Sequence, residues 1–261
     1  MGKVTKKRYL YIEERNNHFQ FGNEIILCLL NQDKIKSRTA IIVGATGLVG
    51  KQCLQLLLTD QYYSKVTVIT PHSTETHHPK MVEHIIDFER LNDYRSLVQG
   101  DHAFCCIDTI VKKPGSKENL RKVNYNYIIN FAEICAFNNI PQFSLISWLQ
   151  ASGKSRIFSK KIKEETEEKI TQLPFHGIQI LRPALLTKRM VEKRLEKIIT
   201  EIFLKGISPL LIGKLKNYKP IAADEVAKAM VEFAKIELKG INIFESNQMQ
   251  FFISQLKKNK K

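Results

Sequence analysis

The sequence has no apolar run approaching the roughly 18 residues of a membrane-spanning helix, so we predict no membrane span. Cysteine is also scarce. There are five cysteines, an odd number, and no spacing among them matches a zinc site or a disulfide framework. They are Cys28, Cys53, Cys105, Cys106 and Cys135. This pattern indicates a reducing, intracellular compartment, and the first residues show neither a secretory signal nor a transit peptide, so we expect a cytoplasmic location.

Acidic residues are few: 26 Asp and Glu stand against 41 Lys and Arg, giving a net charge of +15. Such a balance can indicate binding to nucleic acid or to anionic lipid. The lysines are spread along the chain, however, and only residues 257–261 form a dense basic run. We therefore do not expect nucleic-acid binding as the main function, and an electrostatic adaptor is the weakest of the hypotheses considered. Metal binding is not expected either, because the spacing of His72, His77, His78 and His84 fits no recognised zinc pattern.

The length of 261 residues fits one large α/β domain better than two independent ones. We expect an N-terminal extension over residues 1–37. The main domain would follow over 38–250, with a separate region toward its C-terminal end, and a basic tail over 251–261. Within the extension, the apolar run 25–30 predicts either a short helix docked on the domain or a loosely ordered arm.

From residue 39 onward, short apolar runs alternate with helical patterns. Predicted strands are 40–43, 65–70, 82–86, 103–107, 142–147, 178–181 and 241–244; predicted helices are 48–58, 117–137, 159–172, 191–204 and 223–236. This rhythm predicts a doubly wound parallel sheet of the Rossmann type, with a small helical region on the substrate side near the C-terminus.

The first strand is followed by the loop Gly44-Ala45-Thr46-Gly47-Leu48-Val49-Gly50, which opens a helix. In a dinucleotide-binding loop the first glycine permits the tight turn, and the second lets the backbone approach the pyrophosphate. The third lets the helix pack closely. The N-terminus of the helix then offers N–H groups and partial positive charge to the phosphates. The alternative is a glycine-rich turn without a ligand. The strand, helix and following βα units favour the dinucleotide site.

The second strand ends in Thr70-Pro71-His72 and lacks the acid that bonds the ribose 2′-hydroxyl of NAD. Lys51, directly after the loop, and His72 could instead face a 2′-phosphate. We therefore expect NADP to be preferred over NAD. The alternative for Lys51 is a solvated helix residue.

These motifs together resemble the Tat-interacting-protein-like branch of the atypical short-chain dehydrogenases/reductases. The resemblance covers about residues 39–246. The segments that carry it are the glycine loop, Asp87-Phe88, Phe104-Cys105-Cys106, Lys112-Lys113-Pro114-Gly115-Ser116, Lys122-Val123-Asn124-Tyr125, Ser147, Lys163 and Arg182-Pro183. The glycine motif is shared by the whole superfamily, whereas the lysine–glycine–serine stretch is more specific to the branch.

The resemblance implies a role for each matched cofactor residue. Asp87, with Phe88 beside it, would accept a hydrogen bond from the adenine amino group. Cys106 and Ile107 would lie beside the ribose, and Pro183 and Ala184 would line the nicotinamide.

In this superfamily a Tyr donates the proton to the substrate carbonyl, a Lys four residues later lowers the pKa of that Tyr and holds the nicotinamide ribose, and a Ser orients the carbonyl. Ser147 and Lys163 match the Ser and the Lys, but Ser159 occupies the Tyr position. No Tyr occurs between Tyr127 and Tyr218 to take its place. A serine hydroxyl is a poor proton donor near neutral pH. The alternative for Lys163 is a surface lysine paired with Glu167, and for Ser147 a hydroxyl that caps a turn.

Two hypotheses remain. The chain is either an NAD(P)-dependent oxidoreductase acting on a small carbonyl or alcohol, or a cofactor-binding regulatory or interaction protein, with a possible protein partner, that has lost hydride chemistry. The missing Tyr favours the second hypothesis, and the retained Ser147 and Lys163 favour the first.

Overall fold

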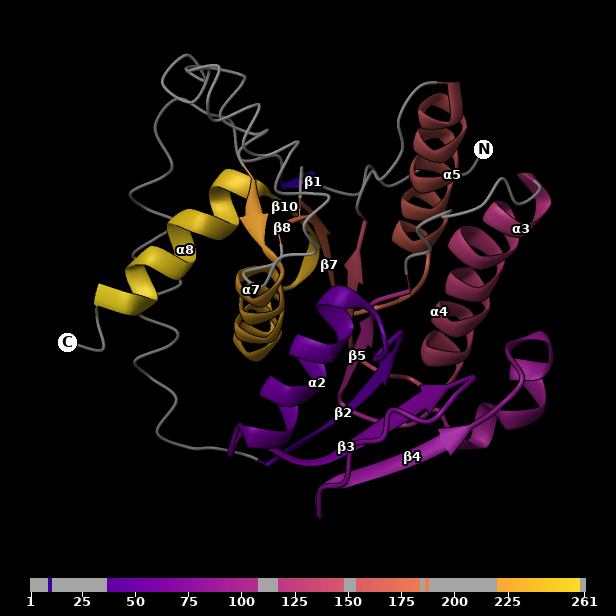
Figure 1. Cartoon of the computed structure of the whole chain (residues 1–261), viewed down its shortest axis with the longest axis horizontal. Helices are drawn as coiled ribbons and strands as arrows, with labels where there is room; N and C mark the ends of the chain where they lie inside the picture. Colours follow the sequence, from indigo (N-terminus) through magenta and orange to yellow (C-terminus); the bar gives the residue numbers. More distant parts are fainter. Residues whose placement is uncertain are drawn as a thin grey trace, which may run out of the picture.

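A parallel sheet forms the centre of the molecule (Figure 1). The computed structural model describes residues 9–10, 37–107, 117–147, 154–183, 186–187 and 220–258. Within these ranges the main sheet has eight strands in the order β1-β10-β7-β6-β5-β2-β3-β4, and every neighbouring pair is parallel. The strands are β1 (Tyr9–Leu10), β2 (Arg38–Val43), β3 (Tyr63–Thr70), β4 (Met81–Ile85), β5 (His102–Cys105), β6 (Gln142–Ile146), β7 (Gly177–Arg182) and β10 (Gly240–Glu245). A separate parallel pair joins β8 (Leu186–Thr187) to β9 (Ile221–Ala222).

Helices cover both faces of the sheet, which confirms the predicted Rossmann-type architecture (Figure 1). One face carries α2 (Leu48–Thr59), α7 (Ala223–Ile236) and α8 (Ser246–Lys258). The other carries α3 (Lys117–Arg121), the π-helical segment η2 (Lys122–Tyr127), α4 (Ile128–Phe137) and α5 (Lys154–Thr171). The 3-10 segment η1 (Phe88–Leu97) follows β4.

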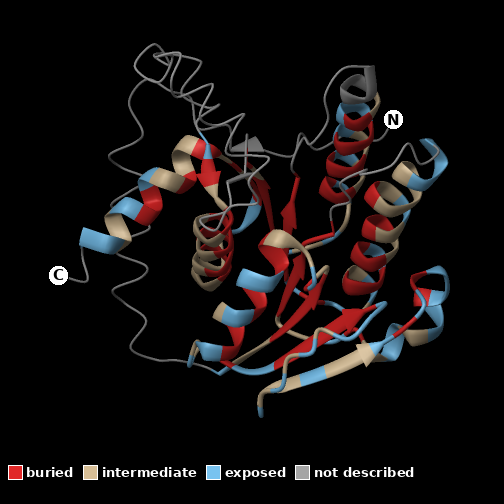
Figure 2. Cartoon of the chain, in the orientation of Figure 1, coloured by how far each residue is buried: buried red, intermediate tan, exposed pale blue. Residues whose placement is uncertain are grey.

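The side chains of β2 point alternately to the two faces of the sheet, so this one strand contributes to both hydrophobic cores. Ala40 and Ile42 pack with α2 and α7, whereas Ile41 and Val43 pack on the opposite face, and all four side chains are fully buried. A strand buried on both faces must be apolar throughout, as the run Ala40–Val43 is. The buried residues therefore form two continuous layers on either side of the sheet (Figure 2).

The C-terminal segment differs from the expected division at residue 250. Helix α8 runs through that point to Lys258, and Phe252 and Ile253 on it are buried. The ring of Phe252 stacks on Phe233 of α7 at 4.4 Å between centroids. Residues 251–258 thus belong to the helical cover of the domain, because their apolar side chains recur at helical spacing among the lysines.

Two other expectations concern regions the structure describes only in part. Within the N-terminal extension, Tyr9 and Leu10 form β1 and extend the sheet beside β10. The apolar run 25–30 and the predicted helix 191–204 lie outside the described residues, as does Cys28. The remaining four cysteines are buried, and none of these four is in a disulfide. No helix in the described part of the chain is long and apolar enough to cross a membrane.

A polar network closes the sheet at the amino ends of β2, β3 and β5. His102 is buried, and its ring nitrogens contact the Tyr63 hydroxyl at 2.9 Å and the Glu237 carboxylate at 3.3 Å. Glu237 ends α7 in the left-handed region (φ 53°) and also pairs with Arg38 at 2.5 Å. The hydrogen bond with His102 and the charge of Arg38 hold the pKa of Glu237 at about 2, against the opposing effect of burial.

We expect Glu237→Gln to lower the free energy of unfolding at neutral pH by about 1 to 2 kcal/mol, after allowance for solvent screening of this partly exposed group. Because the folded pKa lies below the unfolded value of 4.5, the stabilisation is present above pH 4.5 and is lost as the pH falls toward 2. Urea denaturation at neutral pH and at about pH 3.5 measures this. The difference between wild type and variant should shrink at the lower pH, and a difference independent of pH would contradict the assignment.

Candidate active site

Six of the predicted site residues follow six neighbouring strands of the sheet. In spatial order they are Pro183 after β7, Ser147 after β6, Cys106 after β5, Gly44 after β2, His72 after β3 and Asp87 after β4. Because all these strands are parallel, their carboxyl ends lie along one edge. The chain moves outward from β2 to β4 and then crosses back to β5, so the edge between β2 and β5 is the topological switch point where ligands of such sheets bind.

The glycine loop occupies this switch point, and two of its glycines are required by close backbone packing. Gly44 has a φ of +75°, and a Cβ on it would lie 2.4 Å from the carbonyl carbon of Cys106. A Cβ on Gly50 would lie 2.0 Å from the Gly44 carbonyl oxygen. The third glycine of the motif therefore packs the helix against the loop itself.

Gly47 differs from the other two glycines. Its φ is −73°, and a Cβ there would approach the Gly44 oxygen at 3.3 Å and the Cys106 oxygen at 3.8 Å. The fold can accommodate such a contact with a small shift. The packing of the loop therefore does not require a glycine at position 47, and the space beside its backbone is available to a ligand.

The N-terminus of α2 is open to an anion. Its N-cap is Gly47, no side chain caps the helix, and the first turn contains no acid. Thr46 is exposed, Leu48 is partly buried and Val49 is buried. This is the arrangement in which helix N–H groups and the helix dipole attract phosphate.

Lys51 and His72 are both exposed, so both side chains are accessible to a ligand. The hydroxyl of Thr70 donates to the His72 carbonyl at 2.6 Å and fixes the turn after β3. The sequence Thr70-Pro71-His72 places no carboxylate in this turn.

The residues assigned to the adenosine half also lie at strand ends. Asp87 is exposed and Phe88 buried in the turn after β4, while Cys106 and Ile107 are buried after β5. A hydrogen bond with Cys53, together with burial, raises the pKa of the Cys106 thiol well above its usual value. Cys106 is therefore a neutral packing residue here and not a nucleophile.

The three candidate catalytic residues are all buried. Ser147 is 4% exposed, and its N–H donates to the Leu181 carbonyl at 2.8 Å; Ser159 and Lys163 on α5 are 7% and 4% exposed. The alternative of a surface lysine at position 163 is wrong, because the side chain is turned inward.

Two groups of contacts hold α5 in place, and the sequence assigned a role to neither of them. Arg182 Nε donates to both Glu167 oxygens at 3.1 Å, and another of its nitrogens lies 3.6 Å from Glu245. Burial raises the pKa of Glu245 against the effect of the Arg182 charge. This cluster ties α5 to the ends of β7 and β10.

The second group includes Asn124, which is buried in η2 and whose carbonyl accepts a hydrogen bond from the Thr166 hydroxyl at 3.0 Å. The sequence signal for it was a polar Asn within the apolar pattern of the predicted helix 117–137. Local π-helical geometry often marks functional sites.

Protein HTATIP2 of Rattus norvegicus is 30% identical over 175 residues, which cover 66% of this chain and 72% of the relative. The chain belongs to the Tat-interacting-protein-like branch of the atypical short-chain dehydrogenases/reductases. Protein FMP52 of Candida albicans is 28% identical over 213 residues, covering 78% of this chain and 90% of that relative. No family model matches. The fold is also that of the Bordetella bronchiseptica enzyme WbmH in complex with NAD+, with a TM-score of 0.56, 16% identity and coverage of 86% and 82% of the two chains.

The fungal relatives in this branch are named mitochondrial proteins, which overturns the expectation of a cytoplasmic location. That expectation rested on unpaired cysteines and on the absence of a recognisable leader. Free thiols argue only against an oxidising compartment, and they do not distinguish among the reducing ones.

Proposed function

We propose that this chain binds a nicotinamide dinucleotide along the carboxyl edge of its sheet. The observation that carries the proposal is the glycine loop at the β2–β5 switch point, with an uncapped helix behind it. The order of the strands gives the cofactor a direction. Pro183 stands toward the nicotinamide end, the loop at the pyrophosphate and Asp87 toward the adenine end.

The residues present fit such a cofactor at each point. Gly47 leaves space for the pyrophosphate to approach the backbone, and the first turn of α2 offers N–H donors. The side chains of Cys106 and Ile107 are buried on opposite faces of the sheet, so it is their backbone after β5 that would lie beside the ribose. Lys163 is placed inside the molecule, where its ammonium group can donate to ribose hydroxyls.

We further propose that the activity is oxidoreduction of a small carbonyl or alcohol. A bound NAD(P)H supplies the hydride in such a reaction. Ser147 orients the carbonyl by a hydrogen bond, and Lys163 places positive charge near the site of proton donation. Because Ser159 replaces the usual Tyr, the chain lacks a phenolic donor at this position, and carbonyl reduction is expected to be slow.

A second candidate function is a cofactor-binding regulatory protein without turnover. The specific observation that favours it is the same Ser159, which is buried one helical turn from Lys163. A dehydrogenase screen decides between the two: turnover supports the enzyme, and binding without turnover supports the regulatory protein.

We predict tighter binding of NADPH than of NADH, because Lys51 and His72 are exposed and the turn after β3 contains no carboxylate. Titration calorimetry with both cofactors measures the preference. Lys51→Met should weaken NADPH binding about tenfold and leave NADH binding nearly unchanged. A clear preference for NADH would contradict the NADP assignment, and binding of neither cofactor would overturn the proposed site.

A further inference from the structure

The turn after β4 is held by its own side chains. Asp87 is the N-cap of η1, and its carboxylate accepts a hydrogen bond from the Glu89 N–H at 2.9 Å. The next residue, Phe88, packs its ring against Tyr127 of η2 with 5.5 Å between ring centroids. The orientation of Asp87 thus depends on where the first residues of η1 are fixed.

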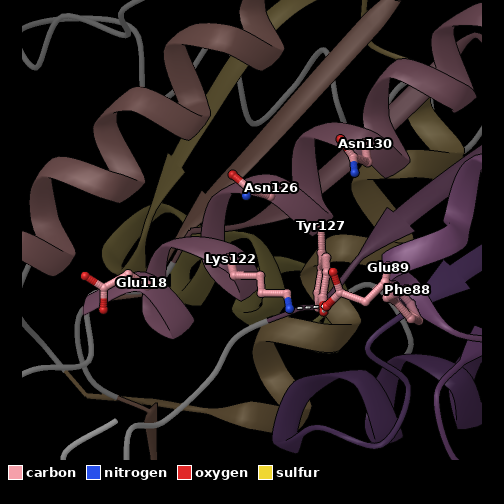
Figure 3. Close-up of a pocket in the computed structure, with 7 residues that line it drawn as sticks. All are labelled: Phe88, Glu89, Glu118, Lys122, Asn126, Tyr127 and Asn130. Carbon is pink, nitrogen blue, oxygen red and sulfur yellow. Dashed lines mark hydrogen bonds and ion pairs between the residues drawn. The ribbon is translucent and has the colours of Figure 1, made fainter. Parts of the chain in front are cut away.

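Glu89 fixes them to η2. Its carboxylate accepts a hydrogen bond from the Tyr127 hydroxyl and forms an ion pair with Lys122 (Figure 3). Burial and the adjacent Glu89 raise the pKa of Tyr127 to about 12, so its hydroxyl remains a donor at physiological pH. The hydrogen bonds from Lys122 and Tyr127 in turn lower the pKa of Glu89, so this acceptor remains charged.

The same residues form the wall of a pocket of about 290 Å³ that opens beside the turn (Figure 3). Its lining consists of Phe88, Glu89, Glu118, Lys122, Asn126, Tyr127 and Asn130. The contact between η1 and η2 is therefore not a filled interface. Phe88 and Leu91 attach this segment through apolar packing in the core, and the Glu89 contacts are its polar attachment to η2.

The far end of η1 is anchored independently. The Asn138 side-chain amide, just after α4, donates to the carbonyl oxygens of Arg95 at 2.8 Å and Val98 at 2.6 Å. Loss of Glu89 should therefore release only the first turn of η1.

We propose that Glu89 is a positioning residue for the adenine end of the cofactor site, acting through Asp87 by anchoring the turn after β4 to Lys122 and Tyr127. This inference rests on the proposed dinucleotide site and assigns a function to residues that the glycine motif and the catalytic set leave out. The matched control is Asp93→Asn, which removes one negative charge from the same segment and breaks only the exposed Arg90–Asp93 pair.

The affinity of Glu89→Gln for NADPH, NADH and AMP should fall about three- to tenfold, a modest loss because exposed ion pairs are individually weak. Asp93→Asn should retain wild-type affinity. In an Asp87→Ala background, Glu89→Gln should have no further effect on AMP binding, because a residue that acts through Asp87 cannot act without it. Additive losses, or equal affinity of wild type and Glu89→Gln, would overturn the proposal.

Hydrogen exchange in the protein without cofactor separates this inference from the proposed function. The amides of residues 88–91 should exchange several-fold faster in Glu89→Gln than in wild type or Asp93→Asn, while those near Val98 remain protected. Unchanged exchange at 88–91 would overturn the anchoring role even if the cofactor binds. Failure of the wild type to bind any dinucleotide would overturn the proposed function and the adenine role together, whatever the exchange shows.

Discussion

Gly47→Val should reduce the affinity for NADPH and NADH by at least about 100-fold, equivalent to about 2.8 kcal/mol of binding free energy, while the protein remains folded. The backbone at Gly47 has an ordinary φ of −73°, so valine is not excluded by conformation. Its branched side chain would, however, fill the space in front of α2 that the pyrophosphate needs. Titration calorimetry measures the affinity, and circular dichroism with thermal unfolding measures the fold.

The other two glycines of the loop provide the contrast. A Cβ on Gly44 or on Gly50 would lie within 2.4 Å of backbone atoms, so Gly44→Ala and Gly50→Ala should lower stability as well as binding. Gly47→Val should separate the two effects. A Gly47→Val protein that is folded and binds with wild-type affinity would show that the phosphates lie elsewhere.

Ser159→Tyr should raise NADPH-dependent reduction of small carbonyl compounds by about 100-fold or more over a low wild-type rate. Residues 159 and 163 are one helical turn apart on α5, and both are turned inward. A phenol at position 159 would therefore meet the charge of Lys163, which favours the phenolate and lowers the phenol pKa toward neutrality. The measurement is NADPH oxidation with a panel of small aldehydes, ketones and quinones.

The matched control for this gain is Ser159→Phe, which adds the same ring without the hydroxyl and should not raise the rate. Adding Lys163→Met to Ser159→Tyr should remove most of the gain, because the phenol then keeps a pKa near 10. Robust wild-type turnover that survives Ser159→Ala would show that the proton comes from another group, and the interpretation of a lost donor would be wrong.

The strands and the glycine loop could be predicted because their signals are local. The apolar run at 40–43 ends in Gly44 and leads into a helix, and β2, the loop and α2 lie where this pattern placed them. Helix α8 and the segment η1 were not predicted. The lysines near its end hid α8, and η1 consists of short 3-10 turns, interrupted at Arg90 and Tyr94, that produce no α-helical spacing of apolar residues.

For the candidate site residues, the sequence predicted positions but not how the side chains are held. It placed Lys163 four residues after Ser159, yet a lysine on a charged helix is equally consistent with a surface position. Only the packing of α5 against η2, and its attachment to Arg182 through Glu167, shows that this lysine points inward. The anchoring of Asp87 by Glu89 joins residues nearly 40 positions apart through Tyr127, and no local pattern predicts such a contact.

The sequence by itself determined the order of the elements and the place of the glycine loop, and it led to the prediction of a lost phenolic donor, because each depends on residue types at short separations. The tertiary structure decided which candidate side chains are buried, at which glycine of the loop a side chain would meet the least crowded backbone, and which contacts hold the turn after β4. The physical reason is that inward or outward placement depends on which helix packs against which face of the sheet. That choice is fixed by the burial of both layers at once and not by any single segment.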